Sequence, residues 1–277
     1  MIFDLNASAK EHILTVAHRG VCGGNIPCNT LPAYEAALAQ GADVLETDIT
    51  ACADGTLFIF HPGMERRYLL SETRLGQMSA DEVRNLRYVN PDGTKTQFGL
   101  MTFDEFLETY KGRCYINVDK FWSNPESISR AIKGHGMKEQ VIVKSSLSDN
   151  VLNVLEEIAP DLAFMPIVAN EFPRHEEMMK RNINYIGAEV LFKNEDAEVA
   201  SEKFIEMMHR DGKLVWVNSI IYNVKDQLSG GHSDDTALTV SPEYGWGWLA
   251  DKGFDLIQTD WTLMMIEYLK STGRYYR

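Results

Sequence analysis

The residues best suited to chemistry lie between His18 and His61, which bracket the carboxylates Glu46 and Asp48. Side chains two residues apart on a β-strand point to the same face, so we expect Glu46 and Asp48 to lie side by side. Two carboxylates at that separation repel each other unless a cation lies between them. Hard oxygen ligands of this kind suit Mg²⁺ or Ca²⁺. The pair therefore predicts a site for one divalent metal ion, and a solvated pair on a strand edge is the alternative.

A third carboxylate, Asp119, ends an expected strand over residues 114–119 and is predicted to complete the metal site. An aspartate in such a place is often only a turn or a helix cap, and a lone histidine at a strand end is often structural. Two histidines beside an acidic cluster can instead accept and donate a proton, because imidazole titrates near neutral pH. The guanidinium of Arg19 suits phosphate oxygens. Together these groups predict phosphoryl transfer around a metal ion.

The elements that must position these groups alternate regularly. Short apolar runs predict strands over residues 13–18, 43–48, 57–60, 114–119, 141–144, 162–166, 185–190, 214–218 and 256–260. Helical spacing predicts helices over residues 30–40, 125–133, 149–158, 176–181, 198–210 and 243–252, and capping boxes at Ser79 and Thr102 predict two further helix starts. This alternation is typical of a (β/α)8 barrel, whose catalytic groups gather at the C-terminal strand ends. A doubly wound sheet is the alternative, but the sequence has no glycine-rich phosphate loop to support it.

The length of 277 residues suits one large α/β domain over residues 1–277. Residues 62–100 are rich in charge and weak in strand pattern, so we expect an inserted subdomain at the barrel mouth. A second irregular stretch, residues 222–242, contains a glycine-rich run over residues 229–235. Long loops of that kind are often lids or binding loops, and His232 in this run is a weaker candidate for the mouth.

The remaining histidines, His12, His135, His175 and His209, have polar neighbours and are expected at the surface. Trp216 and Trp261 are candidates to line the pocket, although packing of the barrel explains them nearly as well.

The composition excludes several classes of partner. Hydrophobic residues make up 44% of the chain, and the net charge is −13. Little basic surface is present to bind nucleic acid or an anionic membrane, whereas a small phosphodiester remains a suitable substrate because a bound metal reverses the local charge. No apolar stretch approaches the roughly 20 residues of a membrane span, and the first residues lack the pattern of a signal peptide. We therefore expect a cytoplasmic protein, or a secreted one if a leader was removed.

Four cysteines are present, and none forms a CxxC pair, so a zinc site is not expected. Reduced, mostly buried thiols are the main prediction. A bridge between Cys22 and Cys28 is the alternative.

The order of these motifs resembles the glycerophosphodiester phosphodiesterases and their barrel relatives, the sphingomyelinase D-like and phosphatidylinositol-specific phospholipase C-like enzymes. The similarity runs almost end to end and is carried by Ala17-His18-Arg19-Gly20, Asn29-Thr30, Gly41-Ala42-Asp43, Glu46-Thr47-Asp48, Asp54-Gly55, His61, Thr102-Phe103-Asp104-Glu105-Phe106-Leu107, Trp216-Val217-Asn218 and Gln258-Thr259-Asp260. The resemblance implies a barrel with a small subdomain inserted after His61. It also implies that His18 and His61 form an acid–base pair and that Arg19 contacts the phosphate. The implied metal ligands are Glu46, Asp48 and Asp119.

Three positions depart from the family pattern. Cys28 stands where the family usually has glutamate, Pro62 where it has aspartate, and Phe121 where it has lysine. Lys120 lies one position earlier, and a shift of one residue along a strand turns a side chain to the other face. Lys120 is therefore expected to contact substrate only if the strand has already ended, and Lys144 on the next strand is the alternative.

The sequence thus predicts a metal-dependent phosphodiesterase that hydrolyses a glycerophosphodiester to an alcohol and glycerol 3-phosphate, with no nucleic-acid partner and no stable membrane association. The alternatives are a phospholipase C- or D-like enzyme on another phosphodiester, a monoester phosphatase, and a barrel that binds phosphorylated ligands without turnover. The choice between Mg²⁺ and Ca²⁺, the roles of the two histidines and the oligomeric state stay open.

Overall fold

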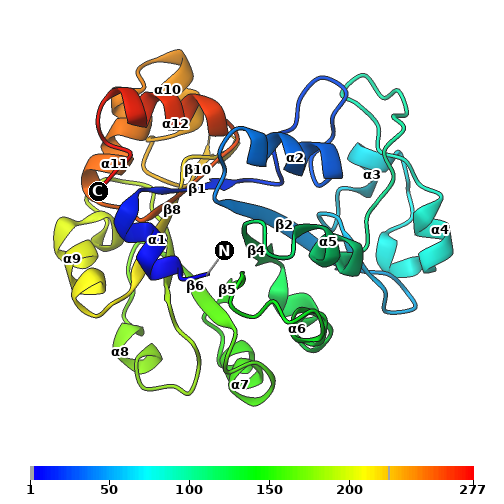
Figure 1. The fold of residues 1–277 in the computed structure, drawn as a ribbon, viewed down its shortest axis with the longest axis horizontal. Helices are drawn as coiled ribbons and strands as arrows, with labels where there is room; N and C mark the ends of the chain where they lie inside the picture. Colours follow the sequence, from blue (N-terminus) through cyan, green and yellow to red (C-terminus); the bar gives the residue numbers. More distant parts are fainter. Residues whose placement is uncertain (1–2, 224) are drawn as a thin grey trace.

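The computed structural model describes residues 3–223 and 225–277 of the chain. Eight parallel strands close into a barrel, since β1 pairs with β2 on one side and with β11 on the other (Figure 1). These strands are β1 (Leu14–Ala17), β2 (Val44–Ala51), β4 (Tyr115–Asp119), β5 (Val141–Ser146), β6 (Ala163–Ala169), β7 (Gly187–Leu191), β8 (Leu214–Asn218) and β11 (Leu256–Thr259). The predicted (β/α)8 barrel is confirmed.

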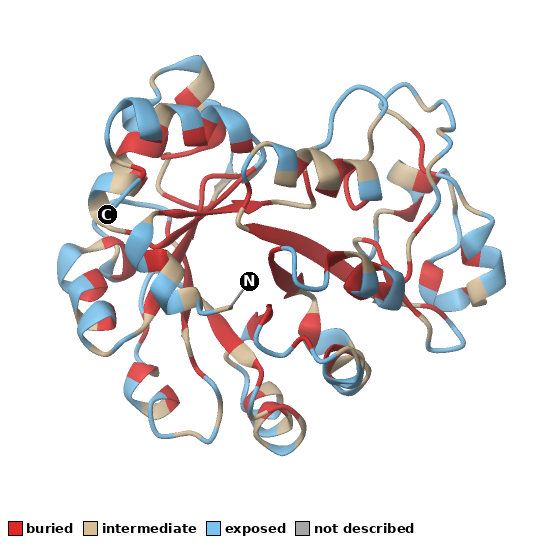
Figure 2. Ribbon diagram, viewed as in Figure 1, coloured by how far each residue is buried: buried red, intermediate tan, exposed pale blue. Residues whose placement is uncertain are grey.

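Helices surround the barrel and bury their inner faces against the strands, while their outer faces stay exposed (Figure 2). The helices that follow successive strands are α2 (Leu31–Ala39), α5 (Phe103–Tyr110), α6 (Pro125–Gly134), α7 (Asp149–Ile158), α8 (His175–Met178), α9 (Glu202–Arg210), α11 (Trp248–Lys252) and α12 (Thr262–Ser271). Two short 3₁₀ helices, η2 (Phe121–Ser123) and η3 (Glu198–Ala200), precede α6 and α9. The long connection after β8 contains β9 (Ile221–Asn223), β10 (Asp226–Gln227), α10 (Asp234–Thr239) and the π-helix η4 (Glu243–Gly247).

The interior of the barrel changes from apolar to polar along the strands. At the N-terminal end, residues such as Leu14, Val44 and Tyr115 form an apolar cluster together with α1 (Leu5–Glu11), which covers that end. On β2, the next side chains of the same face are the two carboxylates at positions 46 and 48, because the strand period is two. The strand pattern itself therefore carries the polar groups to the C-terminal end.

Residues 62–100 follow β3 (Leu57–Ile59), which pairs antiparallel with β2. They contain α3 (Glu65–Leu69), η1 (Leu75–Gln77) and α4 (Ala80–Arg84). Their apolar side chains pack with Phe58 and Phe60 into a cluster distinct from the main core. In Figure 1 the helices α3 and α4 lie outside the ring of barrel helices.

Both predicted capping boxes are confirmed, because Ser79 and Thr102 accept hydrogen bonds from the third backbone N–H of their helices. The helix expected over residues 176–181 is instead the single turn α8, which has few apolar side chains to bury. The helix α12 was not predicted from the sequence, although its buried Met265, Ile266 and Leu269 follow helical spacing. Among the described residues, no helix has the length and apolar character needed to cross a membrane.

Candidate active site

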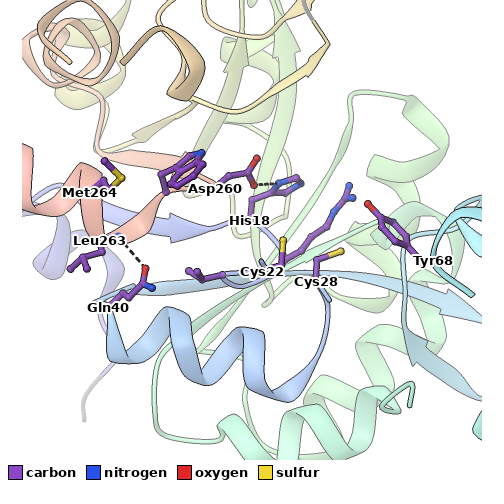
Figure 3. Close-up of a pocket in the computed structure, with 11 residues that line it drawn as sticks. His18, Cys22, Cys28, Gln40, Tyr68, Asp260, Leu263 and Met264 are labelled. Carbon is purple, nitrogen blue, oxygen red and sulfur yellow. Dashed lines mark hydrogen bonds and ion pairs between the residues drawn. The ribbon is translucent and has the colours of Figure 1, made fainter. Parts of the chain in front are cut away.

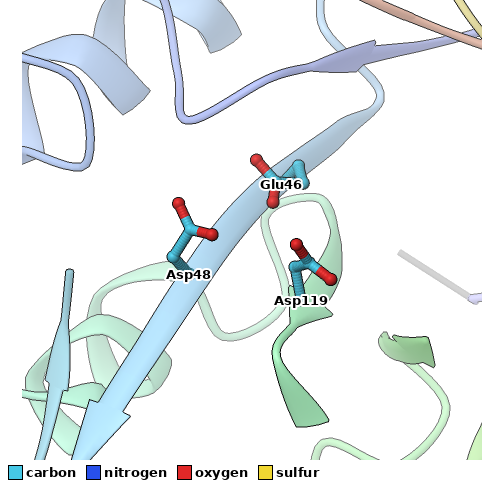
Figure 4. Close-up of side chains that lie close together, drawn as sticks. All are labelled: Glu46, Asp48 and Asp119. Atoms are coloured by element: carbon cyan, nitrogen blue, oxygen red, sulfur yellow. The ribbon is translucent and has the colours of Figure 1, made fainter. Parts of the chain in front are cut away.

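The three predicted metal ligands meet at the C-terminal end of the barrel. Glu46 and Asp48 lie on β2, and Asp119 ends the neighbouring β4, where the strand register pairs it with Asp48. One carboxylate oxygen from each residue lies within 4.8 Å of the other two. Figure 4 shows the three carboxylates gathered around one space. The structure therefore brings together the acidic groups that the strand spacing suggested.

These carboxylates are buried and repel one another. Burial and the charge of Asp48 raise the pKa of Glu46 to about 7. Within the described residues, Asp48 Oδ1 and Asp119 Oδ1 are buried and accept no hydrogen bond. Buried oxygens without a donor are costly, and a compact group of carboxylate oxygens is the donor set that Mg²⁺ and Ca²⁺ prefer. The residues present therefore fit a divalent metal ion.

The loop after β1 positions Arg19 against two of the carboxylates. Arg19 has a φ of 57°, donates its backbone N–H to Glu46 Oε2 at 2.9 Å, and places its Nε 2.8 Å from Asp48 Oδ2. Gly20 follows with a φ of 78°, and a Cβ at this residue would lie 2.7 Å from the backbone carbon of Ala33. Only glycine lets the loop approach α2 this closely. The backbone after β1 thus fixes where the guanidinium lies.

Asn29 also contacts the site, a role that the sequence analysis missed. Its Nδ2 donates to Asp48 Oδ2 at 3.0 Å. Its φ of 58° lies in the left-handed region, which asparagine tolerates better than most residues. The buried hydroxyl of Tyr34 in α2 lies 2.8 Å from Asn29 Oδ1 and 2.7 Å from Thr47 Oγ1. These contacts orient Asp48, and the Asn29-Thr30 motif was the available signal.

Lys120 reaches the carboxylates because β4 ends just before it. Its φ of 63° and ψ of 21° turn the chain out of the strand, and its ammonium contacts Asp119 and lies 3.8 Å from Asp48 Oδ1. The condition set for Lys120 from the sequence, that the strand has already ended, is therefore met. The alternative, Lys144, is buried inside the barrel and its Nζ lies 2.6 Å from Glu189 Oε2.

The two predicted catalytic histidines each have one ring nitrogen occupied. The Nδ1 of His61 lies 2.9 Å from the Pro62 carbonyl, which can only accept, and its Nε2 lies 4.0 Å from Asp48 Oδ1. The Nδ1 of His18 donates to Asp260 Oδ1 at 2.8 Å. In both rings the proton on Nδ1 leaves Nε2 as the nitrogen that can exchange a proton with a bound molecule.

The surroundings shift the pKa values of the two imidazoles in opposite directions. Burial lowers the pKa of His61, although the charge of Asp48 opposes this effect. Burial also acts against protonated His18, but the hydrogen bond to Asp260 and the charge of Glu46 outweigh it and raise the pKa of His18. Two titratable groups whose pKa values are shifted in opposite directions suit acid–base chemistry.

A cavity of about 500 Å³ opens beside this group and is lined by His18 and Arg19 (Figure 3). Trp261 lines it as well, whereas Trp216 is buried inside the barrel. Cys22 and Cys28 lie in its wall as free thiols, so the alternative of a bridge between them is not what the structure shows.

Two expectations for other histidines are wrong. His232 does not reach the mouth, because it is fully buried, stacks on Trp248 at 3.7 Å between ring centres, and has its Nδ1 2.6 Å from the Tyr244 carbonyl. His175 is buried rather than exposed, and its Nδ1 lies 3.0 Å from the Tyr185 hydroxyl. The polar neighbours of these histidines in the sequence do not predict their burial, because their aromatic partners come from other parts of the chain.

Fold and site together define a class of protein, a (β/α)8 barrel with a candidate metal centre and two histidines at its C-terminal end. Among curated proteins, the chain is 28% identical over 159 residues to the glycerophosphodiester phosphodiesterase of Caldanaerobacter subterraneus subsp. tengcongensis, which covers 54% of the chain and 64% of that relative. It is 24% identical over 234 residues to the glycerophosphodiester phosphodiesterase of Bacillus subtilis, which covers 76% of the chain and 77% of that relative. The resemblance is confirmed: the chain is a relative of the glycerophosphodiester phosphodiesterases, a family of phosphoric diester hydrolases.

Solved structures agree in fold. A glycerophosphoryl diester phosphodiesterase from Parabacteroides distasonis superposes with a TM-score of 0.77 at 19% identity, over 95% of this chain and 88% of that one. A phosphodiesterase from Oleispira antarctica, in complex with the product sn-glycerol-3-phosphate, has a TM-score of 0.69 at 17% identity, over 94% of this chain and 97% of that one. The family model DUF4996, a domain of unknown function, matches residues 164–269. The first curated alignment spans less than two-thirds of that relative's length.

Proposed function

We propose that the chain hydrolyses a glycerophosphodiester to an alcohol and glycerol 3-phosphate with the help of one divalent metal ion. The observation that carries this proposal is the group of three carboxylates within 4.8 Å at the C-terminal end of the barrel, with His61 Nε2 4.0 Å from Asp48. The relatedness to glycerophosphodiester phosphodiesterases supports the substrate class.

Glu46, Asp48 and Asp119 would hold the metal ion, Mg²⁺ or Ca²⁺, which when bound supplies positive charge for the phosphate oxygens. Arg19 and Lys120 both contact Asp48, so their cationic groups lie at the edge of the acidic group. They are the two side chains that would bind the phosphodiester anion from the protein side. A guanidinium and an ammonium suit this task because charge-assisted hydrogen bonds to phosphate are strong.

His18 and His61 would move the protons of the reaction. One accepts the proton of the attacking hydroxyl, which belongs to water or to the neighbouring hydroxyl of the substrate. A new P–O bond forms while the P–O bond to the leaving alcohol breaks, and the other histidine gives that alcohol its proton. If the substrate's own hydroxyl attacks, water then opens the cyclic phosphodiester to the same final product.

The direct test is hydrolysis of sn-glycero-3-phosphocholine, followed by the release of glycerol 3-phosphate. We expect turnover that EDTA abolishes and that added Mg²⁺ or Ca²⁺ restores, which also identifies the ion. His18→Ala and His61→Ala should each lower turnover by about 10²–10⁴-fold. His135→Ala is the matched control, because its ring pairs with Asp104 rather than with any group of the site.

The outcome also separates the alternatives. Near-full activity in either site variant would remove that histidine from the mechanism. Turnover of a lysophospholipid or of a phosphomonoester in place of glycerophosphocholine would favour a phospholipase-like or a phosphatase-like enzyme. Metal-dependent binding of glycerol 3-phosphate with no hydrolysis of any ester would favour a barrel that only binds phosphorylated ligands.

A further inference from the structure

The cavity beside His18 and Arg19 is polar at one end and apolar at the other. Three apolar side chains at the start of α12, those of Trp261, Leu263 and Met264, line the apolar end. We call these three residues the apolar rim. In Figure 3, Leu263 and Met264 lie on one side of the cavity and Tyr68 lies on the other, with His18 between them.

Packing of the barrel does not explain the apolar rim. The face of α12 that packs on the barrel consists of Thr262, Met265, Ile266 and Leu269, which follow helical spacing and are buried. The rim residues lie off that face, with exposed fractions of 48% for Trp261, 46% for Leu263 and 48% for Met264. Single exposed apolar residues are common, but three gathered in one cavity wall mark a contact surface.

Hydrogen bonds from the ends of β11 and α2 hold the backbone of the apolar rim in place. Thr259 Oγ1 accepts the backbone N–H of Trp261 at 2.9 Å, and Gln40 Oε1 accepts that of Leu263 at 3.3 Å. Asp260, between β11 and the rim, pairs with His18. A side chain at the rim therefore has a fixed position relative to a proposed catalytic histidine.

Two polar side chains of the cavity wall already have hydrogen-bond partners within the protein. The Asp260 carboxylate is bonded to His18, and the amide oxygen of Gln40 is bonded to Leu263. A ligand that spans the cavity would thus place a phosphate against Arg19 and an apolar group against the rim. A cavity of about 500 Å³ is large enough for such a ligand.

We propose that the apolar rim binds an apolar group on the alcohol side of the substrate, so that the enzyme prefers glycerophosphodiesters of apolar alcohols to those of small polar or cationic alcohols. This inference rests on the proposed phosphodiesterase function and adds the substrate class. The alcohol leaves as before, when the P–O bond breaks and a histidine gives it a proton. Contact with the rim holds the leaving group beside His18.

The test is a series of sn-glycerol 3-phosphate esters of ethanol, butanol, hexanol and octanol, each kept below its micelle concentration, with glycerophosphocholine for comparison. A fully buried methylene is worth up to about fourfold in binding, and a partly exposed one about twofold. We therefore expect kcat/KM to rise by at least about tenfold from the ethyl to the octyl ester.

The variants Leu263→Gln and Met264→Gln should flatten this series while changing kcat/KM for the ethyl ester less than about twofold. Met179→Gln is the matched control, since Met179 has a nearly equal exposed fraction of 45% and does not line the cavity. This variant should keep the full dependence on chain length.

Equal kcat/KM for all alkyl esters, or a clear preference for the choline ester, would overturn the inference while leaving the proposed function intact. A chain-length effect that appears only above the micelle concentration or with phosphatidylcholine vesicles would also overturn it, in favour of a rim that docks on lipid. If no ester is hydrolysed, the proposed function fails. Calorimetry with ethyl phosphate and octyl phosphate then tests the apolar rim separately. The rim is supported only if octyl phosphate binds more tightly than ethyl phosphate and Met264→Gln removes this difference.

Discussion

Asp234 and Asp48 are both buried aspartates on the C-terminal side of the barrel, and they differ in what surrounds them. Asp234, the first residue of α10, accepts hydrogen bonds at Oδ1 from Ser219 Oγ at 2.6 Å, from Trp246 Nε1 at 2.7 Å and from Thr259 Oγ1 at 2.8 Å. Its Oδ2 accepts the backbone N–H of Asp260 at 2.8 Å. Both of its oxygens are therefore occupied by neutral donors.

Asp48 lies instead among charges. Two other carboxylates have oxygens within 4.8 Å of its own, Arg19 and Lys120 contact it, and its Oδ1 accepts no hydrogen bond from the described residues. When all three carboxylates are ionised, they face two permanent cations, so one negative charge is left over. The comparison separates two uses of a buried aspartate. Neutral donors around Asp234 join β8, α10 and β11, whereas the uncompensated group around Asp48 is suited to a further cation.

The largest expected effect is on turnover. Asp48→Asn removes one candidate metal ligand, and we expect turnover to fall by more than about 100-fold, since contacts that only support a ligand already cost about 10–100-fold. The fold should survive, because the substitution also removes a charge from a repelling group. Asp235→Asn, at an exposed position of α10, should keep full activity. A fully active Asp48→Asn protein would place the cation elsewhere.

The next effect is on stability. Asp234→Ala leaves the buried donors of Trp246 and Thr259 without their acceptor, and we expect the free energy of unfolding to fall by about 3 kcal/mol. Urea denaturation with EDTA present measures it, and Asp235→Ala should change stability by less than about 0.5 kcal/mol. If Asp234→Ala is as stable as the wild type, the hydrogen bonds of Asp234 do not stabilise the connection after β8. Asp234 would then have no structural role to set against the metal-binding role of Asp48.

Much of the Asp48 group could be predicted from the sequence, because it depends on short-range rules. The period of two along β2 places Glu46 and Asp48 on one face, and the matching ends of two parallel strands bring Asp119 to them. The barrel itself follows from the alternation of elements. The boundaries of the strands differ by one to a few residues, because tertiary pairing decides where each strand ends.

The Asp234 group could not be predicted, because its partners come from elements far apart in the sequence. Ser219, Trp246 and Thr259 carry no common motif, and a glycine-rich stretch before α10 predicts only a loop. The same limit applies in the site to the pairing of His18 with Asp260, which lie 242 residues apart. The left-handed backbone of Lys120 is a third example, since propensity does not predict it for lysine.

Binding of a metal ion should stabilise the protein through the carboxylates around Asp48 and not through Asp234. With EDTA-treated protein, a metal ion at about 100 times its dissociation constant should add about 2.7 kcal/mol of stability, or roughly 5 °C in Tm. Glu46→Gln should lose most of this gain, whereas Asp235→Asn should keep it. A gain in Tm that persists in Glu46→Gln would point to a cation bound outside the three carboxylates.

The pKa of Glu46 adds a pH dependence with a definite sign. Burial and Asp48 raise the pKa of Glu46 from 4.5 to about 7. The folded state thus holds this proton more tightly than the unfolded state, so the stability from this group is present below about pH 4.5 and lost as the pH rises through about 7. Denaturation of the metal-free protein across this range should show the loss, and Glu46→Gln should lack it.

The smallest expected effect concerns Cys22, a residue of the cavity wall whose thiol has a lowered pKa. A hydrogen bond with Cys28 lowers the pKa of Cys22 to about 7, helped by the charge of His18 and opposed by burial, whereas burial raises the pKa of Cys114 to about 12. The thiolate is the reactive form, so iodoacetamide should alkylate Cys22 at a rate that is half-maximal near pH 7 and falls below it, while Cys114 stays unmodified.

Cys28→Ala should move this midpoint upward, toward the ordinary value of 9.0, and lower the alkylation rate at pH 7 several-fold. Cys52→Ala, which removes a buried thiol away from the cavity, is the control and should leave the midpoint unchanged. A midpoint near 9 in the wild type would mean that Cys22 is an ordinary surface thiol. The hydrogen bond with Cys28 would then not lower the pKa of Cys22.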